Sequence, residues 1–157
     1  MKVGVSGHRR REGADWAWVE KRMIEEVERL KASAGYTSLA PGADQLFAEI
    51  ILARSAALIS VIATVAGEIE IGHEDPHEFG RICARSAEII RVNGKTPDEA
   101  FMRAGMRVVE EADYMIIVWD GAPSRGFGGT ADIVGYARRL KKNGVILDPI
   151  GCGAKKL

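Results

Sequence analysis

Short runs of apolar, largely β-branched residues alternate along the chain with segments of helical periodicity. The longest run, Leu58–Val65, reads LISVIATV, and Met115–Trp119 is a second such run. A strand this uniformly apolar is buried on both faces, as the strands of a parallel sheet are. Because a helix-length segment separates the runs, the sequence predicts an α/β fold with a single doubly wound, mostly parallel sheet and helices on both faces.

The other elements follow from the same alternation. Further strands are predicted at Val3–Ser6, Thr37–Ala40, Ile89–Val92 and Val145–Leu147. Helices are predicted from Asp15 to a stop at Gly35, after Pro41-Gly42, over Glu78–Glu88, from Thr96 onward, and over Ala131–Leu140. A chain of 157 residues supplies one full core and is short for two, so residues 1–157 are expected to form a single Rossmann-like domain.

Composition restricts the class of partner. The 22 Lys and Arg residues are balanced by 22 Asp and Glu residues, which argues against nucleic acid as the main partner. The longest apolar stretch, Ala56–Ala66, contains Ser60 and Thr64 and is too short to span a bilayer, so no membrane association is expected. The two cysteines, Cys83 and Cys152, form no disulfide framework, and the chain is predicted to be cytoplasmic.

Three turns that follow predicted strands share a glycine-rich composition. They are residues 6–9 (SGHR), 40–44 (APGAD) and 119–130 (WDGAPSRGFGGT). In a parallel sheet these turns share one edge, the edge where such sheets bind ligands. Glycine permits a close backbone approach, and helices beginning at Ala43 and Thr130 would direct N–H groups toward an anion. The sequence therefore predicts a phosphate site there, although each turn taken alone also fits a plain tight connection between a strand and a helix.

The candidate ligand-binding residues come from these turns. They are Gly7, His8, Arg9, Gly42, Asp44, Trp119, Gly121, Gly126, Gly128, Gly129 and Thr130. Arg10, Arg11 and Arg125 add positive charge beside them. Trp119 has an alternative role in core packing, where most such aromatics lie.

If the ligand is turned over, the candidate catalytic residues are Asp132 first and Asp120 second. Asp44 and Asp132 also fit a role as partners of the helix dipole, because both lie in first helical turns. No cofactor is expected.

The segment His73-Glu74-Asp75-Pro76-His77 matches the zinc-peptidase pattern H-E-x-x-H, and it is a decoy. That pattern requires both histidines on one continuous helix, and Pro76 disfavours helix at Asp75. We expect no metal site, and we expect Asp75 to cap a helix whose first residue is Pro76.

The three turns also carry a family resemblance. GVSGHR at 4–9, LAPGADQLFAE at 39–49 and ADYMIIVWDG…GGTADIVGYA at 112–137 resemble the SLOG superfamily of Rossmann-like nucleotide-binding proteins. That superfamily includes the Lonely Guy phosphoribohydrolases, the DNA-processing protein Smf and molybdenum-cofactor carriers. The resemblance covers the chain from Val3 to about Ile150. It implies that Gly128, Gly129 and Thr130 bind the phosphate of a nucleotide-like ligand, with Gly7, Gly42 and Asp44 lining the same cleft.

The chain departs from the phosphoribohydrolase motif P-G-G-x-G-T-x-x-E at its last position, where Ile133 replaces the glutamate. The leading hypothesis is therefore a sensor or carrier that binds a phosphorylated nucleotide derivative. One alternative is a phosphoribohydrolase that cleaves the N-glycosidic bond of a nucleoside 5′-monophosphate. A second is a structural or partner-binding homodimer module, with Trp16, Trp18 and Val19 at the contact; a homodimer is the default assembly.

Overall fold

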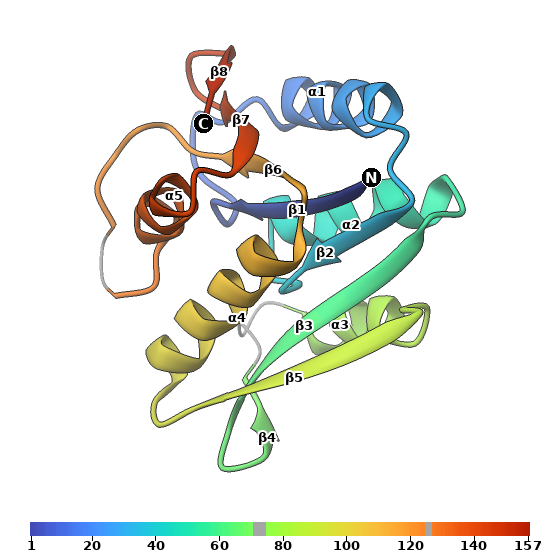
Figure 1. The fold of residues 1–157 in the computed structure, drawn as a ribbon, viewed down its shortest axis with the longest axis vertical. Helices are drawn as coiled ribbons and strands as arrows, with labels where there is room; N and C mark the ends of the chain where they lie inside the picture. Colours follow the sequence, from blue (N-terminus) through green and yellow to red (C-terminus); the bar gives the residue numbers. More distant parts are fainter. Residues whose placement is uncertain (71–74, 125–126) are drawn as a thin grey trace.

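The computed structural model describes residues 1–70, 75–124 and 127–157, and these form one sheet covered by helices (Figure 1). The strand order is β4-β3-β2-β1-β6-β7-β8, and β5, which lies off this path, pairs parallel with β3. The strands are β1 Lys2–Gly7, β2 Ala34–Thr37, β3 Ala57–Val65, β4 Glu68–Ile69, β5 Glu88–Gly94, β6 Tyr114–Val118, β7 Asn143–Asp148 and β8 Gly153–Lys156. Only β4 and β8 pair antiparallel within this described part, so the mostly parallel sheet is confirmed.

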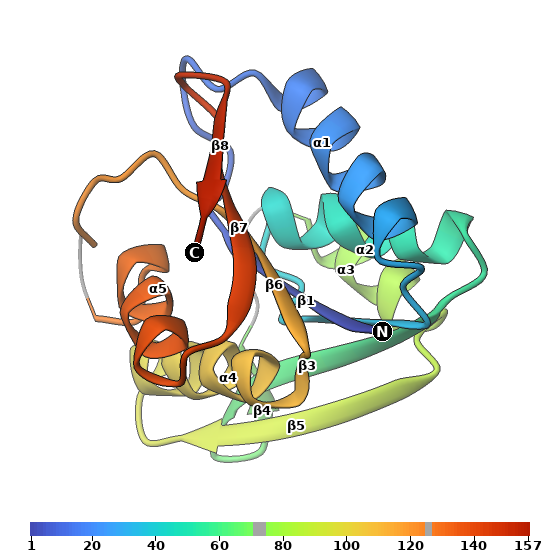
Figure 2. The same ribbon diagram turned by 45° about the horizontal axis from the view of Figure 1, so that its top comes forward.

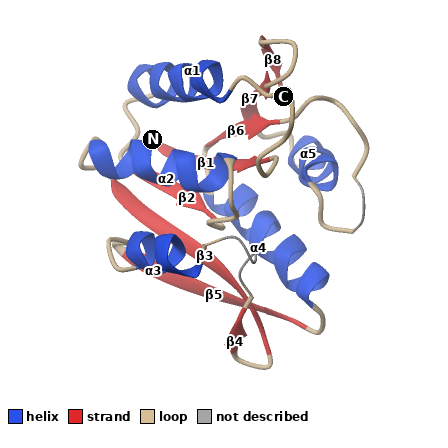
Figure 3. Ribbon diagram, turned by 180° about the vertical axis from the view of Figure 1, so that it is seen from behind, coloured by secondary structure: helices blue, strands red, loops and turns tan. Residues whose placement is uncertain are grey.

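Helices cover both faces of the sheet, as predicted. They are α1 Trp16–Arg29, α2 Ala43–Ala53, α3 Pro76–Cys83, α4 Pro97–Glu111 and α5 Thr130–Arg139. Figure 3 shows α1, α2 and α3 on one face, and Figure 1 shows α4 and α5 on the other. Figure 2 shows the twist of the sheet between these two layers, from β8 at the C-terminal end to β5.

Alternation along the central strands divides the core in two. Val3 and Val5 of β1 pack with α1 and α2, whereas Met115 and Ile117 of β6 pack with α4 and α5. Each strand thus buries side chains on both faces, which explains why the strands are uniformly apolar in the sequence. Among the helices of the described residues, none is long and apolar enough to cross a membrane.

The predicted position of the second strand is wrong. The strand was expected at Thr37–Ala40, with Gly35 ending the preceding helix, but β2 spans Ala34–Thr37 and α1 ends at Arg29. Gly35 lies inside β2, and a glycine is needed there because a Cβ would be 2.5 Å from Ile51 Cγ1 of α2. The residues that follow Thr37 are therefore a loop.

The chain after β3 also differs from the prediction. The helix expected over Glu78–Glu88 ends at Cys83, and the next strand begins at Glu88. The chain leaves the helix early because the Ala87 N–H donates to Leu58 O of β3, which starts the sheet pairing. Strands β4 and β8 were not predicted, and both are short antiparallel additions outside the helix–strand alternation.

The predicted helix starts are confirmed where they rest on capping residues. Asp75 has extended backbone, and its carboxylate accepts the Glu78 N–H at 3.0 Å while Pro76 begins α3. Continuous helix across the H-E-x-x-H match is therefore broken at Asp75; His73 and Glu74 lie outside the described residues. Thr96 likewise caps α4 by accepting the Glu99 N–H.

Gly42 marks a close backbone crossing beside the turn after β1. Its φ of 98° is a conformation that residues with a side chain rarely adopt, and a Cβ would lie 2.6 Å from His8 O. The turn after β1 therefore crosses directly over the start of α2.

We predict that Gly42→Ala destabilises the protein by at least about 2 kcal/mol, because the added methyl strains the backbone and displaces the crossing turn. Thermal unfolding should show a Tm lower by about 5 °C or more. The matched control is Gly80→Ala in α3, where no atom lies within 4 Å of the added Cβ. The control should be neutral or stabilising by up to about 1 kcal/mol; equal loss in both variants would contradict this role for Gly42.

Candidate functional site

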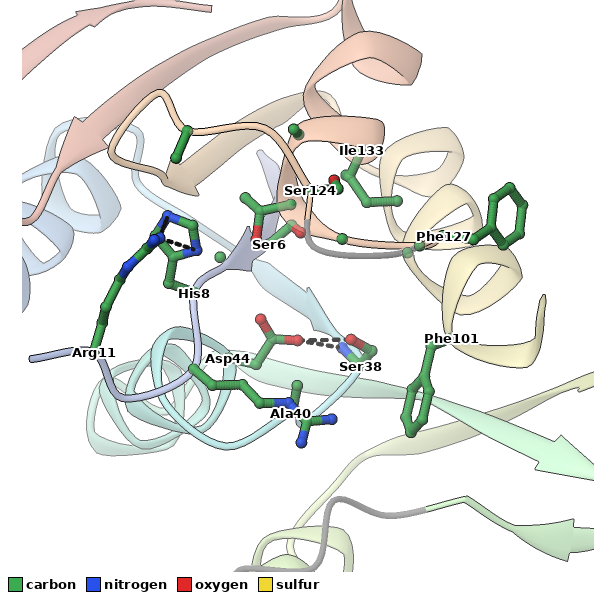
Figure 4. Close-up of a pocket in the computed structure, with 18 of the residues that line it drawn as sticks. Ser6, His8, Arg11, Ser38, Ala40, Asp44, Phe101, Ser124, Phe127 and Ile133 are labelled. Carbon is green, nitrogen blue, oxygen red and sulfur yellow. Dashed lines mark hydrogen bonds between the residues drawn. The ribbon is translucent and has the colours of Figure 1, made fainter. Parts of the chain in front are cut away.

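A cleft of about 760 Å³ opens at the carboxyl edge of the sheet. Its walls come from the turn after β1, the loop after β2, the start of α4 and the segment that leads into α5 (Figure 4). The chain runs from β1 outward to β2 and β3 on one side and returns to β6 on the other, so the cleft lies at the topological switch point. The sheet edge predicted from the three glycine-rich turns is thus the edge that carries the cleft. The volume is in the range of small-molecule sites.

An ionic cluster fixes the wall formed by the turn after β1. Asp120, just beyond β6, lies 2.9 Å from His8 Nε2 and 2.8 Å from Arg11 Nη1 through its two oxygens. Burial opposes ionisation of Asp120, but the Ala122 N–H, His8 and Arg11 outweigh it, and the pKa of Asp120 falls below its ordinary value. Asp120 is therefore an ionised anchor for two cleft-lining side chains.

The first turn of α2 carries a buried carboxylate into the cleft, held by the loop after β2. Asp44 is only 2% exposed, and its Oδ2 accepts the Ser38 hydroxyl at 2.7 Å and the Ser38 N–H at 3.1 Å. Burial raises the pKa of Asp44 to about 6, against the opposing hydrogen bonds from Ser38 and Thr37. A carboxyl that titrates near neutral pH on a cleft wall is a common mark of a functional site.

The third wall is the N-terminus of α5. Asp132 accepts the Gly128 N–H at 3.0 Å and holds the glycine loop against the helix. Within the described part of the chain, no acceptor contacts the N–H groups of Gly129, Thr130 and Ala131, all of which line the cleft. The helix end is thus open toward the cleft, with the partial positive charge of the helix dipole behind it.

Ser124 adds an unused hydroxyl beside this helix end. Its Oγ is buried, has no hydrogen-bond partner among the described residues, and lies where a Cβ on Gly129 would be 2.6 Å away. Buried hydroxyls normally have partners, so a free one on a cleft wall is a position for a ligand atom.

Two aromatic side chains lie at the far end of the cleft. Phe101 comes from α4 and has the Arg9 guanidinium 5.9 Å from its ring centroid. Phe127 precedes α5 and is 64% exposed (Figure 4). The half-buried Phe101 ring beside Arg9, together with the exposed Phe127 ring, offers a stacking surface to a planar ligand group.

The structure brings many of the predicted site residues together on the cleft wall: Gly7, His8, Arg9, Asp44, Gly128, Gly129 and Thr130. It places others behind that wall: Gly42, Trp119, Asp120, Gly121 and Asp132. Gly42 serves the backbone crossing, and the Trp119 indole packs against the α4–α5 core while its Nε1–H donates to Ala122 O at 2.7 Å. Gly126 and Arg125 lie outside the described residues.

Sequence reasoning missed several cleft residues: Ser6, Ser38, Asp98, Phe101, Ser124 and Phe127. Ser38 was hidden because it was assigned to the second strand. Phe101 has the helical spacing of a core residue, and only its place near the start of α4 distinguishes it from one. The exposure of Phe127 could have been predicted, since a large apolar residue between glycines in a turn is rarely buried.

The fold is similar to two solved structures. DNA processing protein A (Smf) from Helicobacter pylori, known for its single-stranded DNA binding mode, matches with a TM-score of 0.67 and 18% identity over 94% of this chain. This chain spans 65% of that protein, which is less than two thirds of its length. TM1055, a structural genomics target of the Rossmann-like LOG family, matches with a TM-score of 0.58 and 14% identity, covering 97% of this chain and 75% of that one.

These likenesses confirm the Rossmann-like fold that the sequence predicts. No family model and no curated protein matches the sequence.

We predict that Asp44→Asn stabilises the protein at pH 7. The asparagine oxygen keeps both Ser38 hydrogen bonds, and the variant avoids the cost of a buried ionised group. A pKa raised from 3.8 to about 6 corresponds to a cost of about 3 kcal/mol at pH 7. Because the raised pKa favours the protonated form in the folded state, this cost disappears as the pH falls from about 6 to about 4.

Urea unfolding at pH 7 and pH 4 checks this. The free energy of unfolding of the variant should exceed that of wild type at pH 7, and the two values should converge at pH 4. A variant less stable than wild type at pH 7 would contradict the burial cost assigned to Asp44.

Proposed function

We propose that the cleft binds a small phosphorylated, nucleotide-like ligand, with its phosphate at the N-terminus of α5, and that the protein acts as a sensor or carrier of this ligand. The observation that carries the proposal is the open helix end: the N–H groups of Gly129, Thr130 and Ala131 line the cleft and have no acceptor within the described residues. A phosphate accepts several such N–H groups at once and is favoured by the helix dipole.

Charge and shape on the other walls support the same ligand class. Arg9, Arg10 and Arg11 line the cleft, and Arg11 is already paired with Asp120, so Arg9 and Arg10 supply the positive charge for a phosphate. The rings of Phe101 and Phe127 suit a planar base. A volume of about 760 Å³ accommodates a mononucleotide.

Binding without turnover is favoured over N-glycosidic hydrolysis. Hydrolysis by the two predicted catalytic aspartates would require one of them to reach the sugar. Asp132 is bonded to the Gly128 N–H, Asp120 is held by His8 and Arg11, and neither lines the cleft. The position of the missing motif glutamate is Ile133, a buried hydrocarbon side chain that borders the cleft and packs against α4 (Figure 4).

The tryptophans of α1 give little support to the alternative of a partner-binding module. Trp16 and Trp18 are half-buried against the core cluster on that face, and Val19 is fully buried. Core packing thus accounts for these three residues, and a homodimer remains a proposal without a surface assigned to it.

Single-stranded DNA should be tested as a partner because the structural neighbour DNA processing protein A binds it. The balance of 22 basic and 22 acidic residues gives this chain no excess charge for a polynucleotide. We therefore propose the mononucleotide as ligand and include a short oligonucleotide in the test.

We predict that binding requires the phosphate. In calorimetric titrations the 5′-monophosphates of adenosine, guanosine, cytidine and uridine are compared with the four nucleosides and with a single-stranded oligonucleotide. At least one monophosphate should bind about tenfold or more tightly than its nucleoside, since hydrogen bonds to a charged group contribute about 1.5–3 kcal/mol. Equal affinity for nucleoside and monophosphate, or binding of the oligonucleotide alone, would refute the proposal.

A variant pair tests the helix end itself. Thr130→Pro removes one N–H from the first turn of α5, and proline is well tolerated there because Gly129 has the extended backbone that precedes a proline. Thr130→Ala removes the hydroxyl and keeps the N–H. We expect Thr130→Pro to weaken monophosphate binding about tenfold relative to Thr130→Ala, with similar Tm values; equal affinities would place the phosphate elsewhere.

A further inference from the structure

Asp44 is both buried and part of the cleft wall, a combination that a purely structural carboxylate does not require. Its exposed fraction is only 2%. The other carboxylates on that wall, Glu12 and Asp98, are exposed at the rim. Asp44 is therefore the acidic group of the interior of the cleft.

Its two oxygens face different surroundings. Oδ2 is occupied by the hydroxyl and the N–H of Ser38, which hold the carboxylate in one orientation. The other oxygen points away from Ser38 and into the cleft, on the side of Ser6 (Figure 4). This arrangement presents a fixed hydrogen-bond acceptor to whatever occupies the cleft.

A carboxylate at this position selects the part of the ligand it meets. It repels a phosphate and accepts hydrogen bonds from uncharged donors such as hydroxyl groups. In a nucleotide, the hydroxyl groups belong to the ribose, between phosphate and base. We propose that Asp44 recognises the ribose hydroxyls of the bound nucleotide, an inference that rests on the proposed function. The cleft then binds nucleotides with a ribose more tightly than nucleotides whose sugar lacks these hydroxyls.

The same group makes binding depend on pH. Burial raises the pKa of Asp44 to about 6, so the acceptor is fully ionised at pH 7.5 and largely protonated at pH 5. Ribose hydroxyls favour the ionised form, and affinity therefore falls as the pH drops below about 6. Among the described residues, the other charged or titratable groups that line the cleft are His8, Glu12 and Asp98 with Arg9, Arg10 and Arg11, and all of them are kept in the variant below.

The test compares each of the four ribonucleoside 5′-monophosphates with its 2′,3′-dideoxy counterpart, in wild type and in Asp44→Asn, by calorimetry at pH 7.5 and pH 5. Asparagine retains the Ser38 hydrogen bonds and turns an N–H₂ group toward the cleft. Wild type should bind a ribonucleotide about tenfold more tightly than the dideoxy form at pH 7.5 and lose most of this preference at pH 5. Asp44→Asn should bind both forms equally at both pH values.

The matched control is Asp98→Asn, an exposed carboxylate at the cleft rim, which should keep the ribose preference. Phosphate-dependent binding that ignores the ribose hydroxyls in wild type, or a preference that survives in Asp44→Asn, overturns the assignment of Asp44 and leaves the phosphate site standing. The absence of any phosphate-dependent binding overturns both proposals. The comparison of the two sugars in wild type needs no variant. It shows whether the cleft prefers ribose, and whether this preference is lost at pH 5, even if Asp44→Asn were poorly folded.

Discussion

The parallel pairing of β1 with β2 and β6 determines where the candidate site lies. Gly7, at the end of β1, is in register with Val118 at the end of β6. One residue later the His8 peptide joins the neighbouring elements: its N–H donates to Val118 O at 3.0 Å, and its carbonyl accepts the Ala43 N–H at 3.2 Å. The first turn is thereby tied to β6 and to α2. Three turns that are far apart in sequence become one cleft because backbone hydrogen bonds hold their strands side by side.

The cleft places groups where they lower stability. Asp44 is ionised at neutral pH in a buried position, and the helix end at Thr130 leaves N–H groups without acceptors among the described residues. The buried charge of Asp44 costs free energy, and a ligand with hydroxyl groups and a phosphate would provide hydrogen-bonding partners for both features. Asp120 differs, because His8 and Arg11 already compensate its charge. This contrast separates the carboxylate that is available to a ligand from those that hold the wall together.

Much of the fold is predictable because it depends on patterns within single segments. The uniformly apolar run that becomes β3 and the caps at Asp75 and Thr96 led to the α/β architecture and the helix starts. Local pattern failed at Gly35, whose role depends on Ile51 of another element. The site was predictable at the level of turns but not of side chains. Which aspartate faces the cleft depends on the hydrogen bonds of Ser38 and Gly128, which no spacing along the chain encodes.

The measurement that tests the central claim most directly is a ¹⁵N–¹H correlation spectrum recorded while a nucleoside 5′-monophosphate is added, with the unphosphorylated nucleoside as reference. The account predicts that the amide signals of Gly129, Thr130 and Ala131 shift downfield with the monophosphate, because their N–H groups gain a phosphate acceptor, and move little with the nucleoside. The signal of Ser38 should respond to both ligands, since it reports on Asp44 and the sugar. Shifts confined to another surface, or identical shifts at the helix end with both ligands, would contradict the account.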